Sequence, residues 1–133
     1  MRPEDEVRTK LVGQWMDKAT QDLLAADALM QQVPPLVYPV CLHCQQASEK
    51  YLKAYLTQSQ VEFTKTHNIA ELLDPVASVD DGLAQELAPA AILTPYGVDA
   101  RYPGDLPEPS EEESRSALGL ARQVAEAVTN RIE

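Results

Sequence analysis

One stretch, Cys41 to Leu56, most constrains how this chain of 133 residues folds. It reads CLHCQQASEKYLKAYL, and at about 100° per residue its apolar side chains cover more than half of a helical circumference. The rest is a narrow set of side chains, named here the polar stripe: His43, Gln46, Glu49, Lys50 and Lys53. A helix of this kind packs inside a bundle, so the polar stripe is expected to face solvent or a space between helices.

A first helix is predicted before this central one, from about Val7 to about Gln32, because Pro34 and Pro35 stop it there. Its apolar residues recur at helical spacing, and Asp22 lies near the middle of them. Burying an unpaired charge is costly. We therefore expect Asp22 to pair with a cation, or with a helix-terminal N–H group, on a neighbouring helix.

Two shorter helices are predicted after the central one. Asn68 is placed to cap a third helix, which Pro75 and the turn at 80–82 are expected to end early. A fourth helix follows, which we expect Pro89 to kink and Pro95 to end. These four predicted helices precede the segment 94–110, which is richer in Pro and Gly.

The segment 94–110 is rich in Pro and Gly and is expected to be irregular. Ser110 and Glu113 then match the capping box of a last helix that runs to the C-terminus. The chain is predicted to be one all-α domain over residues 1–133. Its expected architecture is an antiparallel up-and-down bundle of about five helices, with an irregular Pro/Gly-rich segment before the last helix.

Charge is distributed unevenly in this acidic chain, whose formal net charge is −10. Residues 1–67 carry seven Lys or Arg against eight Asp or Glu, whereas residues 68–133 carry four against thirteen. Phosphate backbones and anionic membranes need a positive field, so neither duplex DNA nor a membrane is an expected partner. With no long apolar run, no apolar leader and few cysteines, we expect a cytoplasmic protein.

Cys41 and Cys44 form a Cys-x-x-Cys pair that raises the question of a zinc or redox site. Tetrahedral zinc needs two further ligands, and only His43 and His67 offer imidazole; His43 points from a different helix face than the cysteines. Both thiols lie on the apolar arc, so we interpret them as two small buried side chains. No metal or cofactor is predicted.

Five cations stand out against the acidic background and are the candidate nucleotide-binding residues: Lys50, Lys53, Lys65, His67 and Arg101. If they converge, they hold phosphate groups together with the free N–H groups that begin the third helix. Tyr102 or Tyr51 would stack on a base. Residues expected to support such a pocket are Asp22, His43, Glu49 and Tyr102. An equally weighted alternative is that Lys50 and Lys53 form ordinary salt bridges within the bundle.

At these residues the sequence resembles the HEPN family, the higher eukaryote and prokaryote nucleotide-binding domains. The matching positions are Trp15, Ala19, Asp22-Leu23 and Ala26; Gln45-Gln46-Ala47, Glu49-Lys50 and Lys53-Ala54; Lys65-Thr66-His67; and Arg101-Tyr102-Pro103. The resemblance implies an up-and-down helical bundle, commonly a homodimer. It also implies a minimal nucleotidyltransferase as the partner, in a two-component or toxin–antitoxin system.

Many HEPN relatives resemble metal-independent ribonucleases in which Arg precedes His by about four to six intervening residues. This chain lacks that motif. The residues standing where the arginine is needed are Leu36, Val37 and Tyr38 before His43, and Gln60, Val61 and Glu62 before His67. We therefore expect a non-catalytic module that binds a nucleotide of the ATP or GTP class. The alternatives are a pure interaction and dimerisation module and, last, a divergent ribonuclease.

Overall fold

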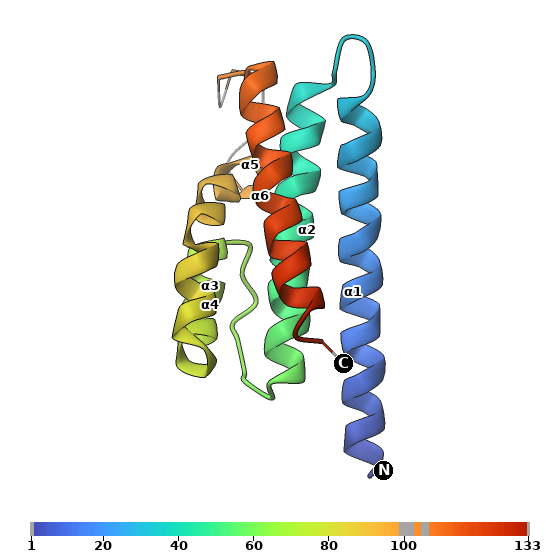
Figure 1. Ribbon diagram of the computed structural model, residues 1–133, viewed down its shortest axis with the longest axis vertical. Helices are drawn as coiled ribbons and strands as arrows, with labels where there is room; N and C mark the ends of the chain where they lie inside the picture. Colours follow the sequence, from blue (N-terminus) through green and yellow to red (C-terminus); the bar gives the residue numbers. More distant parts are fainter. Residues whose placement is uncertain (1, 99–102, 105–106, 133) are drawn as a thin grey trace.

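The computed structural model describes residues 2–98, 103–104 and 107–132 of the chain (Figure 1). These residues form helices and turns, with no β-strand among them. The helices are α1 (Pro3–Met30), α2 (Val37–Gln58), α3 (Ile69–Val79), α4 (Asp81–Leu87), the 3-10 helix η1 (Ala88–Leu93), α5 (Thr94–Val98) and α6 (Glu111–Thr129). The predicted all-α bundle is confirmed. None of these described helices combines the length and apolar character that crossing a bilayer demands.

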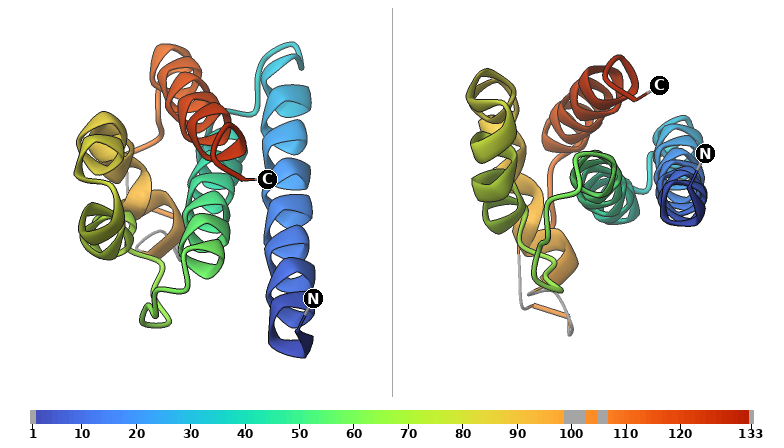
Figure 2. Two further views of the ribbon diagram at one scale, coloured as in Figure 1. Left: turned by 60° about the horizontal axis from the view of Figure 1, so that its bottom comes forward. Right: turned by 90° about the horizontal axis from the view of Figure 1, so that it is seen from below.

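The central helix of the sequence is also central in space. Viewed along its axis, α2 lies between α1, α6 and the group formed by α3, α4 and α5 (Figure 2). α1 and α2 run antiparallel and share the most extensive contact in the molecule. The helices α3 to α5 carry the chain back toward the starting end of α2, so α6 runs in the same direction as α2 (Figure 1).

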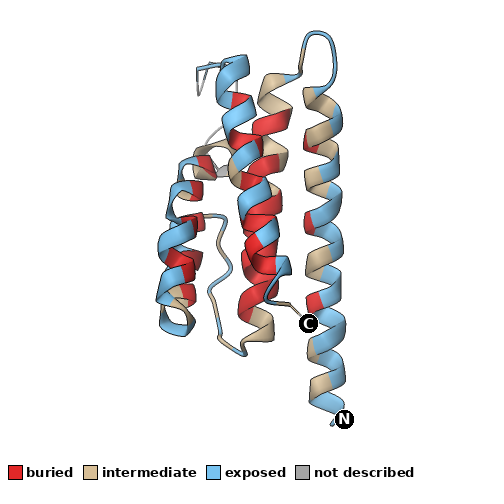
Figure 3. Ribbon diagram, in the orientation of Figure 1, coloured by how far each residue is buried: buried red, intermediate tan, exposed pale blue. Residues whose placement is uncertain are grey.

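Burial follows this arrangement, because α2 is buried along most of its length whereas α1 and α6 bury only one side each (Figure 3). Small residues form the helix contacts: Ala19 and Ala26 of α1 and Ala121 of α6 are fully buried. Alanine allows close approach of helix axes with little loss of side-chain entropy. The polar stripe of α2 is thereby enclosed along one edge by α1.

The predicted helix ends agree with the structure where a capping residue marks them. The Asn68 side chain accepts hydrogen bonds from the N–H groups of Ala70 and Glu71, and Ser110 and Glu113 form the reciprocal capping box. α1 begins at Pro3, earlier than predicted, because proline needs no N–H partner in the first helical position.

Two proline predictions were wrong. Pro75 lies inside α3, which continues to Val79 and ends at Asp80, the start of the predicted 80–82 break. The interruption predicted at Pro89 agrees with the structure, because α4 ends at Leu87 and the 3-10 helix η1 begins with Ala88 and Pro89. Pro95 lies in the first turn of α5 instead of ending a helix, since proline is tolerated there. Residues 94–98, the start of the segment predicted to be irregular, therefore form a helix.

The C-terminal end of α2 contains one strained residue. Gln60 has a φ of 59°, the only positive value on a non-glycine residue in the described part of the chain. The N–H of Val61 donates to the carbonyl of Leu56 at 3.0 Å, which closes the left-handed ending that glycine usually provides. The fold therefore tolerates a glutamine where its backbone favours glycine.

Gln60→Gly is expected to raise the free energy of unfolding by roughly 0.5 to 1 kcal/mol. Relief of the left-handed strain outweighs the extra chain entropy of glycine in the unfolded state. Urea denaturation followed by circular dichroism measures the change. A variant less stable than the native chain would show that the Gln60 side chain contributes more than its backbone costs.

Candidate functional site

Two carboxylates organise the polar stripe, one from each of the two longest helices. Asp22 lies on α1 and Glu49 on α2, and each bonds one lysine and one histidine. Each carboxylate is largely removed from solvent, so its charge needs nearby partners. The result is two adjoining clusters along one edge of the α1–α2 contact.

The Asp22 cluster joins α1 to the middle part of α2. Lys50 Nζ lies 2.5 Å from Asp22 Oδ2, and His43 Nδ1 lies 3.0 Å from Asp22 Oδ1. Carboxylate oxygens only accept, so His43 donates its Nδ1 proton. The predicted pairing of Asp22 with a cation on a neighbouring helix is confirmed.

The Glu49 cluster is more deeply buried. The Glu49 side chain is only 4% exposed and that of Lys53 only 7%, and the two pair at 3.1 Å. His67, from the segment before α3, brings its Nδ1 within 2.9 Å of the other Glu49 oxygen. Lys53 also lies over the ring of Trp15, with Nζ 5.4 Å from the ring centroid. One continuous set of contacts thus runs from α1 through α2 to His67.

Gln45 completes this cluster and was missed by the sequence analysis. It is fully buried, and its amide nitrogen donates to Glu49 at 3.2 Å and to the His67 carbonyl at 3.0 Å. Its amide oxygen accepts from Gln46 at 2.8 Å and lies against Gly97 of α5. The signal that could have identified Gln45 in the sequence is its position as a long polar side chain beside the apolar arc.

The five predicted cations are not all brought to one place. Lys50 and Lys53 pair with separate carboxylates, as the salt-bridge alternative anticipates. Lys65 is exposed, near His67 in the chain, and Arg101 and Tyr102 lie outside the described residues. Tyr51 is buried, and its hydroxyl bonds Thr20, which leaves its ring unavailable for stacking.

The N–H groups at the start of α3 are also committed within the chain. Ile69 N–H donates to the Thr94 hydroxyl, and the next two N–H groups donate to the Asn68 side chain. An anion at this helix end would have to displace those acceptors. Among the predicted phosphate ligands that the structure describes, His67 and Lys65 are the exposed ones.

An open groove of about 510 Å³, named here the aromatic groove, lies beside Trp15. Its apolar lining comes from Leu11 and Trp15 on α1 and from Val61 and Phe63 after α2. Its polar lining residues are Arg8, Thr57, Gln60 and Glu62. The groove contains the only tryptophan and the only phenylalanine of the chain.

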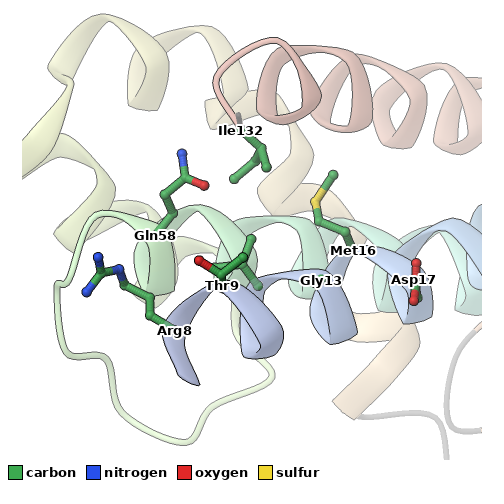
Figure 4. Close-up of a pocket in the computed structure, with 8 residues that line it drawn as sticks. Arg8, Thr9, Gly13, Met16, Asp17, Gln58 and Ile132 are labelled. Carbon is green, nitrogen blue, oxygen red and sulfur yellow. The ribbon is translucent and has the colours of Figure 1, made fainter. Parts of the chain in front are cut away.

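A second pocket, of about 350 Å³, lies on the other edge of α1 (Figure 4). Thr9, Gly13 and Met16 of α1 line it together with Gln58 of α2 and Ile132 from the end of the chain. A Cβ at Gly13 would meet nothing within 4 Å, so this glycine leaves the pocket open without serving an internal contact. Arg8 and Asp17 also line the pocket and supply one charge of each sign.

The two cysteines are free and buried. Burial raises the pKa of the Cys41 thiol to about 11 and that of the Cys44 thiol to about 12. In the described part of the chain, no three residues of the metal-ligating types are arranged to hold an ion. Both thiols lie in the core cluster, as predicted.

Iodoacetamide is expected to alkylate Cys41 at least about 100-fold more slowly in the folded chain than in urea, because the folded pKa lies about two units above the ordinary 9.0. The folded state holds the thiol proton more tightly, so this contribution to stability is present below about pH 9 and is lost as pH rises through 11. Mass spectrometry of timed samples measures the rate. Equal rates in both states would contradict the burial.

The chain is a small helical domain with a buried polar network between its first two long helices, α1 and α2. The chain belongs to the HEPN domain family, whose model matches residues 12–132. This is a family of nucleotide-binding and ribonuclease-type modules. No curated protein and no solved structure compared with the chain is similar enough to count as a match.

Proposed function

We propose that this HEPN domain is a non-catalytic nucleotide-binding module that works with a minimal nucleotidyltransferase. The observation that carries the proposal is the position of His67. Its side chain is 64% exposed, yet Glu49 fixes its orientation by bonding Nδ1. An exposed imidazole held in one orientation is suited to binding an anion through its other nitrogen.

Binding of phosphate at His67 requires the doubly protonated ring, because Nδ1 already donates to Glu49 and Nε2 must donate to the phosphate. Exposed Lys65, two residues earlier in the chain, adds a second positively charged group close to His67 in the sequence.

Lys50 and Lys53 act differently from Lys65. Their charges are balanced by Asp22 and Glu49, so they position the carboxylates and leave little net positive charge for a ligand. Replacing Lys50 by glutamate would place two carboxylates together and destabilise the bundle. Tests of the phosphate site therefore belong on the exposed residues.

The test is isothermal titration calorimetry of the purified chain with ATP, GTP and their monophosphates. We expect micromolar affinity, with losses of about tenfold in His67→Gln and in Lys65→Glu. Lys10→Glu is the matched control, since it reverses one exposed lysine on α1 outside both pockets, and we expect it to bind as the native chain does.

Failure of all four nucleotides to bind would overturn the nucleotide site. Cleavage of RNA without metal, abolished by His67→Ala, would instead identify a divergent ribonuclease.

A separate experiment tests the protein partner. Co-expression with a nucleotidyltransferase encoded beside this chain is expected to yield a complex on size-exclusion chromatography, and the free chain is expected to elute as a homodimer.

The second candidate function is a pure interaction module. The observation that favours it is the internal pairing of Lys50 and Lys53, together with the occupied N–H groups at the start of α3. On this account the polar stripe stabilises the bundle and binds nothing. Formation of the complex with the nucleotidyltransferase would then be unaffected by His67→Gln, and nucleotides would give no heat of binding.

A further inference from the structure

We propose that the aromatic groove holds the base of the bound nucleotide, an inference that rests on the function proposed above. The groove contains both the only Trp and the only Phe of the chain, Trp15 and Phe63. Its volume of about 510 Å³ lies in the range of small-molecule sites. Aromatic side chains of this kind bind planar heteroaromatic rings by stacking.

The polar lining supplies the groups that a base edge needs. Gln60 offers an amide donor and an amide acceptor, and Glu62 offers an acceptor for an exocyclic amino group. Gln60 is held in the left-handed backbone conformation at φ 59°, where glycine would be less strained. The left-handed ending of α2 thus places a glutamine among the residues that line the groove.

Trp15 adds an independent observation. Its indole nitrogen Nε1 is covered and has no hydrogen-bond partner among the described residues. A covered donor is not reached by a ligand in the groove, so the contribution of Trp15 to the base site is the face of its ring. The ring itself is held in place by the Lys53 ammonium at 5.4 Å from its centroid.

The groove and the phosphate site belong to one network. Trp15 contacts Lys53, Lys53 pairs with Glu49, and Glu49 holds His67. The contacts thus connect a residue that lines the groove with the residue proposed to bind phosphate. The polar lining favours a nucleotide over an apolar peptide, since an apolar side chain would use the rings but neither Gln60 nor Glu62.

The experiment uses the fluorescence of Trp15, which is the only tryptophan and therefore reports on the groove alone. Adenosine, guanosine, their monophosphates and inorganic phosphate are titrated into the full chain. We expect both nucleosides and both nucleotides to quench Trp15 saturably, and inorganic phosphate to leave it unchanged. Removing one stacking ring with Phe63→Ala is expected to weaken nucleoside binding by about tenfold.

Two further variants keep the result interpretable. Phe63 packs against the core, so Glu62→Ala, on an exposed side chain, is the second groove variant and is expected to weaken binding without loss of stability. Ile92→Ala is the matched control, because it truncates an exposed apolar side chain outside the groove and should bind normally.

The outcomes separate this inference from the proposed function. Nucleotides that bind by calorimetry without quenching Trp15, and with no effect of Phe63→Ala or Glu62→Ala, would overturn the base site and leave the nucleotide-binding function standing. Nucleosides that quench Trp15 while His67→Gln leaves nucleotide affinity unchanged would support the base site and overturn the phosphate site. Absence of binding by every probe would overturn both.

Discussion

Glu49→Leu is expected to lower the free energy of unfolding by about 3 to 5 kcal/mol, a large share of the stability of a domain of this size. Lys53 is the reason, because its ammonium is buried against Glu49 and would be left without a counter-charge. His67 and Gln45 would lose a hydrogen-bond acceptor at the same time. Urea denaturation at neutral pH measures the change.

A double-mutant cycle provides the control. Lys53→Met is expected to cost less than Glu49→Leu, since Glu49 keeps its bonds to His67 and Gln45. The double variant Glu49→Leu/Lys53→Met should recover most of the loss, because apolar side chains replace a buried ion pair at little cost. Losses that simply add in the double variant would contradict a coupled buried pair.

Gly97→Ala is expected to destabilise the bundle by about 3 kcal/mol, because the new methyl group has no room. A Cβ at Gly97 would lie 2.1 Å from Gln45 Oε1 and 2.4 Å from Gln45 Cδ. The end of a flexible side chain usually moves aside, but the Gln45 amide is fully buried and bonded to Glu49 and to the His67 carbonyl. Relief of the clash therefore breaks the Glu49 cluster or displaces α5.

Gly119→Ala is the matched control with the opposite sign. Gly119 lies on the exposed side of α6, and a Cβ there would meet nothing within 4 Å. Alanine is a better helix former than glycine, so we expect this variant to be more stable by about 1 kcal/mol. Similar effects of the two substitutions would mean that packing against Gln45 does not determine the cost at Gly97.

The fold was largely predictable because periodicity and capping act locally. The apolar arc around Cys41–Leu56 required a buried helix, and Asn68 and Ser110 marked helix starts that the structure confirms. The proline positions were less informative. Whether Pro75 or Pro95 ends a helix depends on its place within the turn, and that place is fixed by packing between distant segments.

The candidate site was predictable only in part. The pairing of Asp22 was predictable, because a carboxylate among apolar residues needs a positively charged partner. Lys50 is that partner. Spacing alone did not show that the Glu49 cluster would recruit His67 from another segment, or that Gln45 would be buried against Gly97. These contacts depend on how the segment after α2 folds back, which local patterns do not encode.

The polar stripe thus has two proposed roles, one in stability and one in ligand binding. The pair Glu49 and Lys53 is buried and stabilises the packing around α2, whereas the second Glu49 oxygen orients the exposed side chain of His67. Substitutions of Glu49 or Lys53 are therefore expected mainly to lower the stability of the fold. Variants at His67, Lys65 and Glu62 are expected to change binding at nearly constant stability, because these side chains are exposed.

The most direct test of nucleotide binding by this HEPN domain is a two-dimensional ¹H–¹⁵N spectrum during titration with AMP and GMP. The single Trp15 gives one indole N–H signal, which is well separated from the backbone amides. The account predicts that this signal shifts saturably, together with the backbone amides of Gln60, Phe63 and His67. A spectrum unchanged at saturating nucleotide, or shifts confined to other helices, would contradict it.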